Sequence, residues 1–338
     1  MIHHFLHSFF LLAISGLVLL PVAGCGPAPD SAEAPLVYRL KWLYNMSVVG
    51  DLYSLEHDFF VQEGLEVDIR PGGPERDAIK ELEIGRAHFG VASADQVIRA
   101  VAKGSPVVVL AQLFQVSPLQ WIHRAGKNPI QTPDDLKNKV IGITYGGNDE
   151  TIMRALLAKH RIGEEVIEFV SVRYDYTPFY QGKVDLWPVY QNAEGLIISE
   201  KLAQAGEEAD FFNPNEFGIR FVANSIITTE QMVREHPETV SRFTRALLRG
   251  WRQSLDPANT DKAVATVQRF DRDTSVSLLK NQLDATRTLM MPSSGKDFGW
   301  IDSHAWEQTA RIMFEQKLIV APVSVDEILL SVGKLRQK

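Results

Sequence analysis

Two short stretches of the sequence combine aromatic rings with amide or carboxylate groups at the end of a predicted strand. The first, LKWLYN, contains Trp42 and Asn45, which either cap the strand or face something other than protein. The second, VDLWPVYQNAEGL, contains Tyr190 and Glu194. An aromatic ring offers a flat apolar face for stacking, and a carboxylate accepts strong hydrogen bonds from amines. These residue types suit a small planar polar ligand, with a core tryptophan and a turn asparagine as the alternative.

A glycine-containing loop precedes another predicted helix and resembles an anion-binding loop, with Tyr145 and Gly147 leading to Asn148. However, Asp149 and Glu150 occupy the first turn of that helix, where they satisfy the helix dipole and repel an incoming anion. The loop therefore favours a neutral or amine-bearing ligand over sulfonate, phosphate or nitrate. A well-capped helix without a ligand is the structural alternative for each acid.

Strand-like runs alternate with helical stretches along most of the chain, which is typical of βαβ units and a mostly parallel sheet. A first set begins near residue 36 and a second near residue 121, and after residue 229 the chain is predicted to be helical. In SADQV, Ser93 or Asp95 can cap a helix. Ligands of open parallel sheets bind beyond the carboxyl ends of the strands. We therefore expect the ligand-binding residues there: Trp42, Asn45, Ser93, Asp95, Gln115, Tyr145, Gly147, Asn148, Tyr190 and Glu194.

The composition is that of a globular protein long enough for two domains of ordinary size. The chain has 338 residues, 45% of them hydrophobic and 23% charged, with a net charge of −7. It lacks the basic footprint of a nucleic-acid-binding protein, so no nucleic-acid partner is expected. The nine histidines show no metal-binding spacing, so no metal is expected.

The first 24 residues are predicted to be a bacterial lipoprotein signal peptide. The apolar run FLLAISGLVLLPVA is too short for a comfortable membrane span, and the following VAGC resembles a lipobox. Cleavage would leave Cys25, the only cysteine, as a lipidated N-terminus on the outer face of the bacterial cytoplasmic membrane. Residues 25–35 are small, polar and Pro-rich, as in a flexible tether. An ordinary signal peptide with a chance cysteine is the alternative.

Several segments that occur in this order resemble a known family. They are KW-x-x-N at 41–45, FF-x-x-EGLEV at 59–67, GRAHFGVASADQV at 85–97 and HPETVSRFTRALLRGW at 236–251. They resemble the solute-binding proteins of ABC importers for the pyrimidine precursor of thiamine. A eukaryotic thiamine pyrimidine synthase is a relative, and alkanesulfonate- and nitrate-binding proteins are more distant ones.

The resemblance implies an α/β fold of the type 2 periplasmic binding protein class, with two lobes and a ligand cleft between them. Lobe one would comprise residues 36–117 and 224–338, and lobe two residues 118–223. Two hinge crossings would lie near FQVSP and FVANS. The resemblance also implies that Trp42, Asn45, Tyr190 and Glu194 line the cleft, and that one of Tyr174, Tyr176 and Tyr180 reaches it.

The implied function is the capture of a small planar N-heterocycle, above all a thiamine pyrimidine precursor. The protein would act as a monomer and pass the ligand to ABC permease and ATPase subunits. Pyrimidine-binding relatives carry His and Tyr where this chain has Val48 and Leu52, so riboflavin, another heterocycle or an alkanesulfonate- or nitrate-type anion remain alternatives. A ligand sensor that signals to a partner protein is a further one.

An enzyme of pyrimidine synthesis is the alternative from another class. The enzyme branch carries a Lys and a His four residues apart, and these positions align with Ala92 and Gln96 here. Without the lysine no Schiff base with pyridoxal phosphate can form, and the cysteines of the enzyme are absent as well. We therefore expect no cofactor and no catalytic residue.

Overall fold

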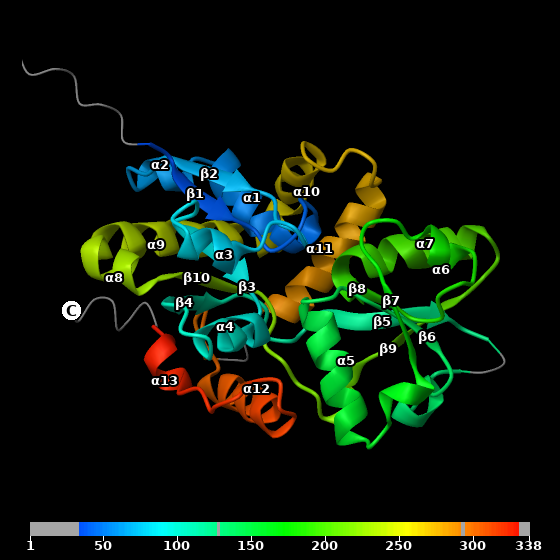
Figure 1. Cartoon of the computed structure of the whole chain (residues 1–338). Coiled ribbons are helices and arrows are strands. Elements are labelled where there is room, and N and C mark those ends of the chain that lie inside the picture. The colour runs from blue at the N-terminus through cyan, green and yellow to red at the C-terminus, as the bar shows by residue number, and fades with distance from the viewer. Residues whose placement is uncertain (1–33, 127–128, 292–294, 331–338) are drawn as a thin grey trace, which may run out of the picture. The chain divides into compact units, whose positions relative to one another are not determined.

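The computed structural model describes residues 34–126, 129–291 and 295–330, and Figure 1 shows two groups of strands, each covered by helices. The first group is a five-stranded sheet in the order β2-β1-β3-β10-β4. Its strands are β1 (Leu36–Arg39), β2 (Val67–Arg70), β3 (Phe89–Ala92), β4 (Val107–Gln112) and β10 (Ser225–Thr229). With its helices, this sheet forms what we call the first lobe.

The second lobe contains a three-stranded sheet in the order β8-β5-β9 and the pair β6-β7. Its strands are β5 (Leu119–Arg124), β6 (Val140–Ile143), β7 (Glu168–Ser171), β8 (Trp187–Tyr190) and β9 (Ala209–Phe212). An isolated bridge between Ile141 and Leu186 connects the pair to the segment that leads into β8.

Helices on both sides of the sheets supply the rest of the core, and Figure 1 shows α11 between the two groups of strands. In the first lobe they are α1 (Val49–Glu56), α2 (Phe59–Gln62), α3 (Ala78–Glu83), α4 (Ala94–Val101), α8 (Glu230–Glu235), α9 (Pro237–Leu255), α10 (Thr260–Gln268), α11 (Val276–Met290), α12 (Ser303–Glu315) and α13 (Val325–Ile328). In the second lobe they are α5 (Asn148–Lys159), α6 (Thr177–Tyr180) and α7 (Leu196–Gln204). Two short turns also matter below: the 3₁₀ turn η1 (Met46–Val48) and the π-helical turn η4 (Gln191–Gly195).

The chain passes between the two lobes twice. It leaves β4 for β5 through residues 113–118 and returns from β9 to β10 through residues 213–224. These segments contain or adjoin the predicted FQVSP and FVANS crossings, so the two-lobed α/β fold with two crossings is confirmed. The exact lobe boundaries at 36–117, 118–223 and 224–338 stay a prediction.

The prediction of a mostly parallel sheet is right for part of the structure only. Strand β1 runs parallel to β2 and β3, and β6 runs parallel to β7. Strand β10 is antiparallel to β3 and β4, and β5 is antiparallel to β8 and β9. Strands β5 and β10 each enter a sheet from the other lobe, so they need no helical crossover and run against their neighbours.

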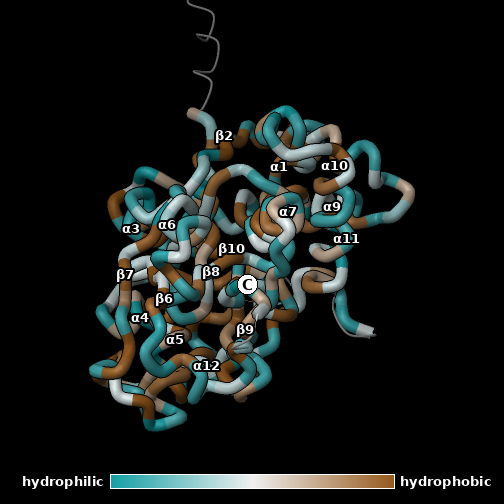
Figure 2. Tube along the Cα trace, turned by 90° about the vertical axis from the view of Figure 1, so that its right-hand side faces the viewer, coloured by the Kyte–Doolittle hydropathy of each residue, from teal (hydrophilic) through white to brown (hydrophobic). Residues whose placement is uncertain are grey.

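The long helix α9 confirms the amphipathic pattern predicted for it. Val240, Phe243, Leu247 and Trp251 follow helical spacing and are completely buried. Phe243 stacks on Phe89 of β3 with the ring centroids 3.7 Å apart. In the hydropathy-coloured trace of Figure 2, α9 and α11 carry both hydrophobic and hydrophilic residues, as expected of helices with one buried face.

Helices α1 and α9 approach so closely that their contact requires glycine. A Cβ atom on Gly50 would lie 2.0 Å from the Trp251 ring, and one on Gly250 would lie 1.9 Å from Ser54 Oγ. Among the described residues, no helix is both long and apolar enough to cross a membrane. The predicted signal peptide, Cys25 and most of the tether lie outside the described residues.

Candidate functional site

A cavity of about 230 Å³ lies where the ends of strands from both lobes meet. Its lining follows the carboxyl ends of β1, β3, β6, β7 and β8, the edge at which open α/β sheets bind ligands. Seven of the ten residues predicted to bind ligand line this cavity: Trp42, Asn45, Tyr145, Gly147, Asn148, Tyr190 and Glu194. Their binding roles stay a prediction.

The other three predicted residues are not part of the lining. Ser93 forms a capping box with Gln96 at the start of α4, and Asp95 is completely buried without a hydrogen-bond partner among the described residues. The Gln115 amide nitrogen donates to the carbonyl oxygens of Gln112 and Trp300 at 3.2 and 3.1 Å. The neighbouring residues Ala92 and Gln96 line the cavity instead.

Trp42 forms one wall of the cavity and contacts an aromatic ring of the other lobe. Its ring lies 5.2 Å from that of Tyr174, which comes from the second lobe. The Tyr174 hydroxyl lies so near Gly73 that a Cβ atom there would be 2.2 Å away, and Gly73 has a φ of 143°. Of the three tyrosines that the sequence left open, Tyr176 lines the cavity, whereas the Tyr180 ring is occupied by the Lys201 ammonium at 4.0 Å.

Asn45 and Glu194 connect the two lobes across the cavity. The Asn45 amide nitrogen donates to Glu194 Oε1 at 2.9 Å, and Asn45 Oδ1 accepts from the Ser47 N–H at 2.8 Å. Glu194 Oε2 accepts only a long bond, of 3.4 Å, from the Tyr190 N–H. Removal from bulk water raises the pKa of Glu194, and these hydrogen bonds partly oppose the rise. Each carboxylate oxygen can accept more than one bond, so Glu194 retains acceptor capacity towards the cavity.

Lys41 is the residue of this site that the sequence reasoning missed. Its Nζ donates to Asn148 Oδ1 at 3.0 Å and to the Tyr190 hydroxyl oxygen at 2.9 Å. The Tyr190 hydroxyl in turn donates to Asn224 Oδ1 at 2.9 Å. The signal for Lys41 in the sequence is its place beside Trp42 at the end of a predicted strand.

The acids at the start of α5 bind the loop before them. Asp149 Oδ2 accepts the Thr144 N–H at 2.5 Å, and Glu150 Oε2 accepts the Gly146 N–H at 2.7 Å. Burial raises the pKa of Asp149 to about 6, against the effect of these bonds and of Lys41. The acids occupy backbone N–H groups of the loop before α5. The helix itself begins after Gly147 without a side-chain cap, so the alternative of a well-capped helix is not borne out.

The turn η4, which carries Glu194, is held from the first lobe by α11. The Asn192 amide nitrogen donates to Ser47 Oγ at 3.2 Å and to Thr286 Oγ1 at 2.8 Å. The Gln282 amide nitrogen donates to the Ala193 carbonyl oxygen at 3.1 Å. These contacts, together with those of Asn45 and Lys41, bridge the lobes on both sides of the cavity.

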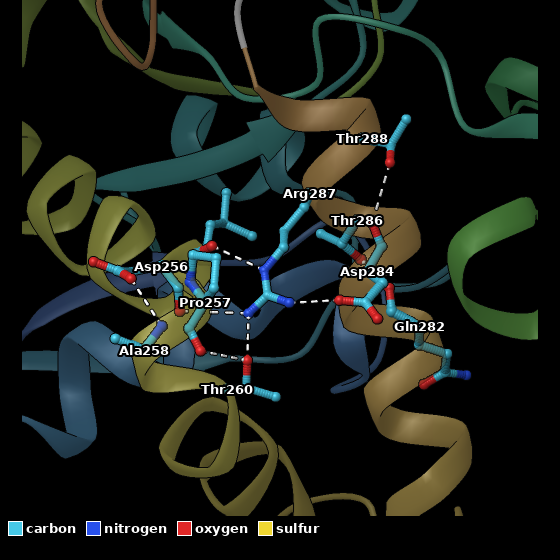
Figure 3. Close-up of polar contacts among 10 residues, drawn as sticks. Asp256, Pro257, Ala258, Thr260, Gln282, Asp284, Thr286, Arg287 and Thr288 are labelled. Atoms are coloured by element: carbon cyan, nitrogen blue, oxygen red, sulfur yellow. Dashed lines mark hydrogen bonds and ion pairs between the residues drawn. The ribbon is translucent and has the colours of Figure 1, made fainter.

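Helix α11 is itself anchored within the first lobe by Arg287, which Figure 3 shows reaching the turn between α9 and α10. Its guanidinium donates to the Leu255 carbonyl oxygen at 2.9 Å, to Thr260 Oγ1 at 2.7 Å and to Asp284 Oδ1 at 2.5 Å. Gln282 and Thr286 lie on the same helix, so the position of η4 depends on this anchor.

The remaining wall is apolar. Val48 lines the cavity, at the position where the family resemblance implied a histidine, whereas Leu52 is completely buried and not part of the lining. Trp187, predicted to pack in its strand, is 2% exposed, and its ring meets that of Tyr176 edge to face at 5.6 Å. Trp187 also belongs to the lining, so it contributes to both the core and the wall.

Comparisons with known proteins agree with this geometry. The chain is 24% identical to the formylaminopyrimidine-binding protein of Halalkalibacterium halodurans, over 96% of this chain and 99% of that protein. It is also 24% identical to the riboflavin-binding protein RibY of Chloroflexus aurantiacus, over 94% of this chain and 95% of that protein. A more distant match, 20% identical over 69% of this chain and 75% of the relative, is a 4-amino-5-hydroxymethyl-2-methylpyrimidine phosphate synthase of Saccharomyces cerevisiae.

Among solved structures, the alkanesulfonate-binding protein SsuA of Xanthomonas axonopodis pv. citri bound to MOPS has the same fold. The TM-score is 0.66 at 17% identity, over 88% of this chain and 98% of that one. This likeness confirms the predicted two-lobed periplasmic binding protein fold. Residues 45–260, more than half of the chain, match the model of the family described as NMT1/THI5 like. The chain therefore belongs to the NMT1/THI5-like family.

Proposed function

We propose that the protein is the substrate-binding component of an ABC importer and captures a small planar N-heterocycle, with a pyrimidine precursor of thiamine as the ligand. The observation that carries the proposal is the pairing of an aromatic wall at Trp42 with the Asn45–Glu194 contact in one interlobe cavity. The aromatic wall suits stacking, and the carboxylate suits an exocyclic amine.

The size of the cavity favours a single ring over a flavin. At about 230 Å³ it lies just below the range of about 300–1,000 Å³ typical of small-molecule sites. A pyrimidine with a short substituent suits this volume better than the three fused rings and ribityl chain of riboflavin. Riboflavin remains the second candidate because a relative of similar identity is named for binding it.

The charges in the lining disfavour an anionic ligand. Asp149 and Glu194 contribute two carboxylates to the lining. Asp149, and Glu150 outside the lining, already accept the Thr144 and Gly146 N–H groups. A sulfonate in this cavity would meet these acids and find the nearby loop N–H groups occupied. The fold shared with an alkanesulfonate-binding protein therefore does not carry its ligand over to this chain.

A synthase activity finds no support in the groups that line the cavity. Ala92 and Gln96 line it at the two positions where the enzyme branch carries its Lys and His. Alanine offers no amine for a Schiff base, and the sequence has no cysteine beyond residue 25. We therefore infer binding without catalysis.

The proposal includes the predicted lipid anchor at Cys25 and a location on the outer face of the cytoplasmic membrane. A monomer tethered there would close on its ligand and deliver it to the permease and ATPase subunits. Contacts such as Asn45–Glu194 exist only when the lobes are together, so a ligand that binds both lobes favours this state.

A thermal-shift screen tests the proposed ligand class. The panel contains 4-amino-5-hydroxymethyl-2-methylpyrimidine, riboflavin, ethanesulfonate and nitrate. A ligand at about 100 times its dissociation constant stabilises the folded protein by about 2.7 kcal/mol. We expect the pyrimidine to raise the melting temperature and Trp42→Ala to reduce this rise. A shift with the anions alone would contradict the proposal.

A second experiment separates import from sensing. Deletion of the gene is expected to abolish uptake of the radiolabelled pyrimidine, and the full-length gene is expected to restore it, whereas a version with Cys25→Ala is not. Intact uptake with an altered transcriptional response to the pyrimidine would instead identify a ligand sensor.

A further inference from the structure

We propose that Tyr174 is a specificity-determining residue that limits the length of the ligand, because it closes the mouth of the cavity against Gly73 when the two lobes come together. The inference rests on the proposed function and deepens it, since it concerns the size of the molecule that the same cavity accepts. It follows from the place where the cavity meets solvent, from the contacts of Tyr174 and from the backbone of Gly73.

The cavity has a buried end and an end that meets solvent. Glu194 and Trp187 lie at the buried end, and Trp187 is 2% exposed. At the other end, Tyr145 and Arg173 line the cavity although both are exposed, and each follows one of the paired parallel strands β6 and β7. Gly73 of the first lobe also belongs to the lining. We call the opening between Gly73, Tyr145 and Arg173 the mouth of the cavity, since a ligand enters and leaves there.

Tyr174 reaches from the second lobe across this mouth to the first. Its ring lies 5.2 Å from the Trp42 ring and is tilted against it by 42°, and its hydroxyl lies against Gly73. The Tyr174 side chain is 47% exposed, so it forms an outer layer over Trp42, which lines the cavity. Both contacts join the two lobes, so they form on closure and are lost when the lobes part.

The backbone of Gly73 leaves room for the Tyr174 hydroxyl. A Cβ atom on Gly73 would lie 2.2 Å from that hydroxyl oxygen, which is far closer than van der Waals contact. The φ of Gly73 is 143°, in a region that residues with a side chain rarely adopt. Gly73 also forms an isolated bridge with Arg76 in a tight turn. Conformation and space therefore both require glycine where Tyr174 meets the first lobe.

The neighbours of these two residues meet as well. Glu75, two residues after Gly73, forms an ion pair with Arg173, which precedes Tyr174. Both charged side chains are more than half exposed, so the pair itself contributes little affinity. It shows, however, that the two segments come together along the mouth. A molecule that projected between them would hold the lobes apart.

The length of a ligand therefore decides whether the mouth can close. A ligand bound through its amine at Glu194 is enclosed only if its far end stops short of Tyr174. Overpacking a closed interior costs about 5- to 150-fold in affinity, so a longer molecule should bind more weakly by such a factor. Support of the Trp42 ring is the competing role for Tyr174, and it would change the affinity for every ligand by the same factor. The ratio of affinities for long and short ligands separates the two roles.

Three ligands with one ring measure the length limit. They are 4-amino-5-hydroxymethyl-2-methylpyrimidine, its butyl ether, and the homologue with a butyl group in place of the 2-methyl group. The two elongated compounds extend in different directions, so the test does not depend on how the ring is turned. In isothermal titration, the wild-type protein is expected to bind both about tenfold or more weakly than the parent compound. Tyr174→Ala, with its fold checked by circular dichroism, is expected to bring at least one of them to within about threefold of the parent.

Tyr180→Ala is the matched control. Tyr180 belongs to the same segment of the second lobe, but its ring contacts the Lys201 ammonium at 4.0 Å and not the cavity. This variant is expected to keep the wild-type preference for the short ligand.

Gly73→Ala tests the contact itself when it is made in two backgrounds. Beside Tyr174 the added methyl group meets the hydroxyl, so this variant should weaken binding of the parent pyrimidine. In the Tyr174→Ala background that clash is gone, and the same substitution should cost at least about threefold less. The backbone strain at Gly73 is common to both backgrounds and cancels in the comparison.

The outcomes distinguish this inference from the proposed function. If the wild type binds the elongated compounds as tightly as the parent, or if Tyr174→Ala restores neither of them, Tyr174 does not limit ligand length. Equal recovery in Tyr180→Ala, or an equal cost of Gly73→Ala in both backgrounds, would also overturn the inference. If the parent pyrimidine does not bind the wild-type protein, the proposed function itself is wrong, and the inference fails with it.

Discussion

Replacing Glu194 by Gln is expected to weaken binding of a 4-aminopyrimidine while leaving the free protein at least as stable. The change preserves the shape of the side chain and an oxygen for the Asn45 amide, which donates to Glu194 at 2.9 Å. It removes the negative charge that the ligand amine would pair with. A hydrogen bond to a charged group contributes about 1.5–3 kcal/mol, so the dissociation constant should rise by about 10- to 150-fold.

The effect on stability has the opposite sign because the pKa of Glu194 is raised by its removal from water. In the unfolded chain the carboxyl group ionises near its ordinary pKa of about 4.3, whereas the folded protein resists ionisation. The free energy of unfolding of the ligand-free protein therefore falls as pH rises from the ordinary pKa of the carboxyl group to its raised pKa in the folded protein. Above the raised pKa it does not recover. Glu194→Gln lacks this loss, so its melting temperature at neutral pH should equal or exceed that of the wild type.

Isothermal titration and thermal melts of the same preparation measure both effects. Glu200→Gln on α7 is the control, since Glu200 is exposed and outside the cavity lining; it should change neither affinity nor melting temperature. If Glu194→Gln binds the pyrimidine as tightly as the wild type, the carboxylate is not part of the recognition. If it binds weakly only because it is unfolded at the assay temperature, the pKa reasoning is wrong.

The remaining predictions concern the wall, the core and the anchor of α11. Trp42→Ala should weaken the pyrimidine by about 1 kcal/mol or more through loss of stacking, with the fold retained by circular dichroism; unchanged affinity would remove Trp42 from the site. Burial raises the pKa of Asp51 to about 7, so the free energy of unfolding should fall as pH rises from about 4 to 7. Asp51→Asn can still accept hydrogen bonds from Tyr38 and Trp251, and in urea titrations it should make the free energy of unfolding less dependent on pH. An equally steep slope in the variant would exclude Asp51 as its source. Arg287→Met should lower the free energy of unfolding by about 2 kcal/mol because several partly buried hydrogen bonds are lost. Arg245→Met is the control; it breaks an ion pair whose arginine is 46% exposed and should change the free energy of unfolding by less than about 1 kcal/mol. Equal effects of the two variants would contradict the anchoring role of Arg287.

The periodicity of the sequence predicts the lobes and many of the elements, because hydrophobic spacing is a local property. The buried face of α9 follows from spacing alone. The reversed directions of β5 and β10 do not, since they depend on how the chain crosses between lobes.

The residues at strand ends were predicted better than their neighbours. Trp42, Asn45, Tyr190 and Glu194 stand at strand ends, and the structure brings them into one cavity. For Ser93 and Asp95, the sequence could not show which way the first turn of α4 faces. Lys41 was missed because its partners, Asn148 and Tyr190, lie more than 100 residues away in the chain.

The hold of α11 on η4 was equally invisible in the sequence. The Asn192 contact with Thr286 spans 94 residues, and the Gln282 contact with Ala193 spans 89. Amides in helices have no spacing signal of their own, and only the packed structure shows that they meet. The residue that anchors this helix, Arg287, is likewise one of many arginines in the sequence, and nothing there distinguishes it.

The central claim is that the interlobe cavity binds a planar N-heterocycle through Trp42 and Glu194. Its most direct test is isothermal titration with N-formyl-4-amino-5-aminomethyl-2-methylpyrimidine of two proteins, the wild type and the double variant Trp42→Ala/Glu194→Gln. The wild type is also titrated with ethanesulfonate. We expect saturable binding of one pyrimidine per wild-type chain, loss of that binding in the folded double variant, and no heat of binding with ethanesulfonate. Saturable binding of ethanesulfonate without pyrimidine binding, or full pyrimidine affinity in the double variant, would contradict the claim.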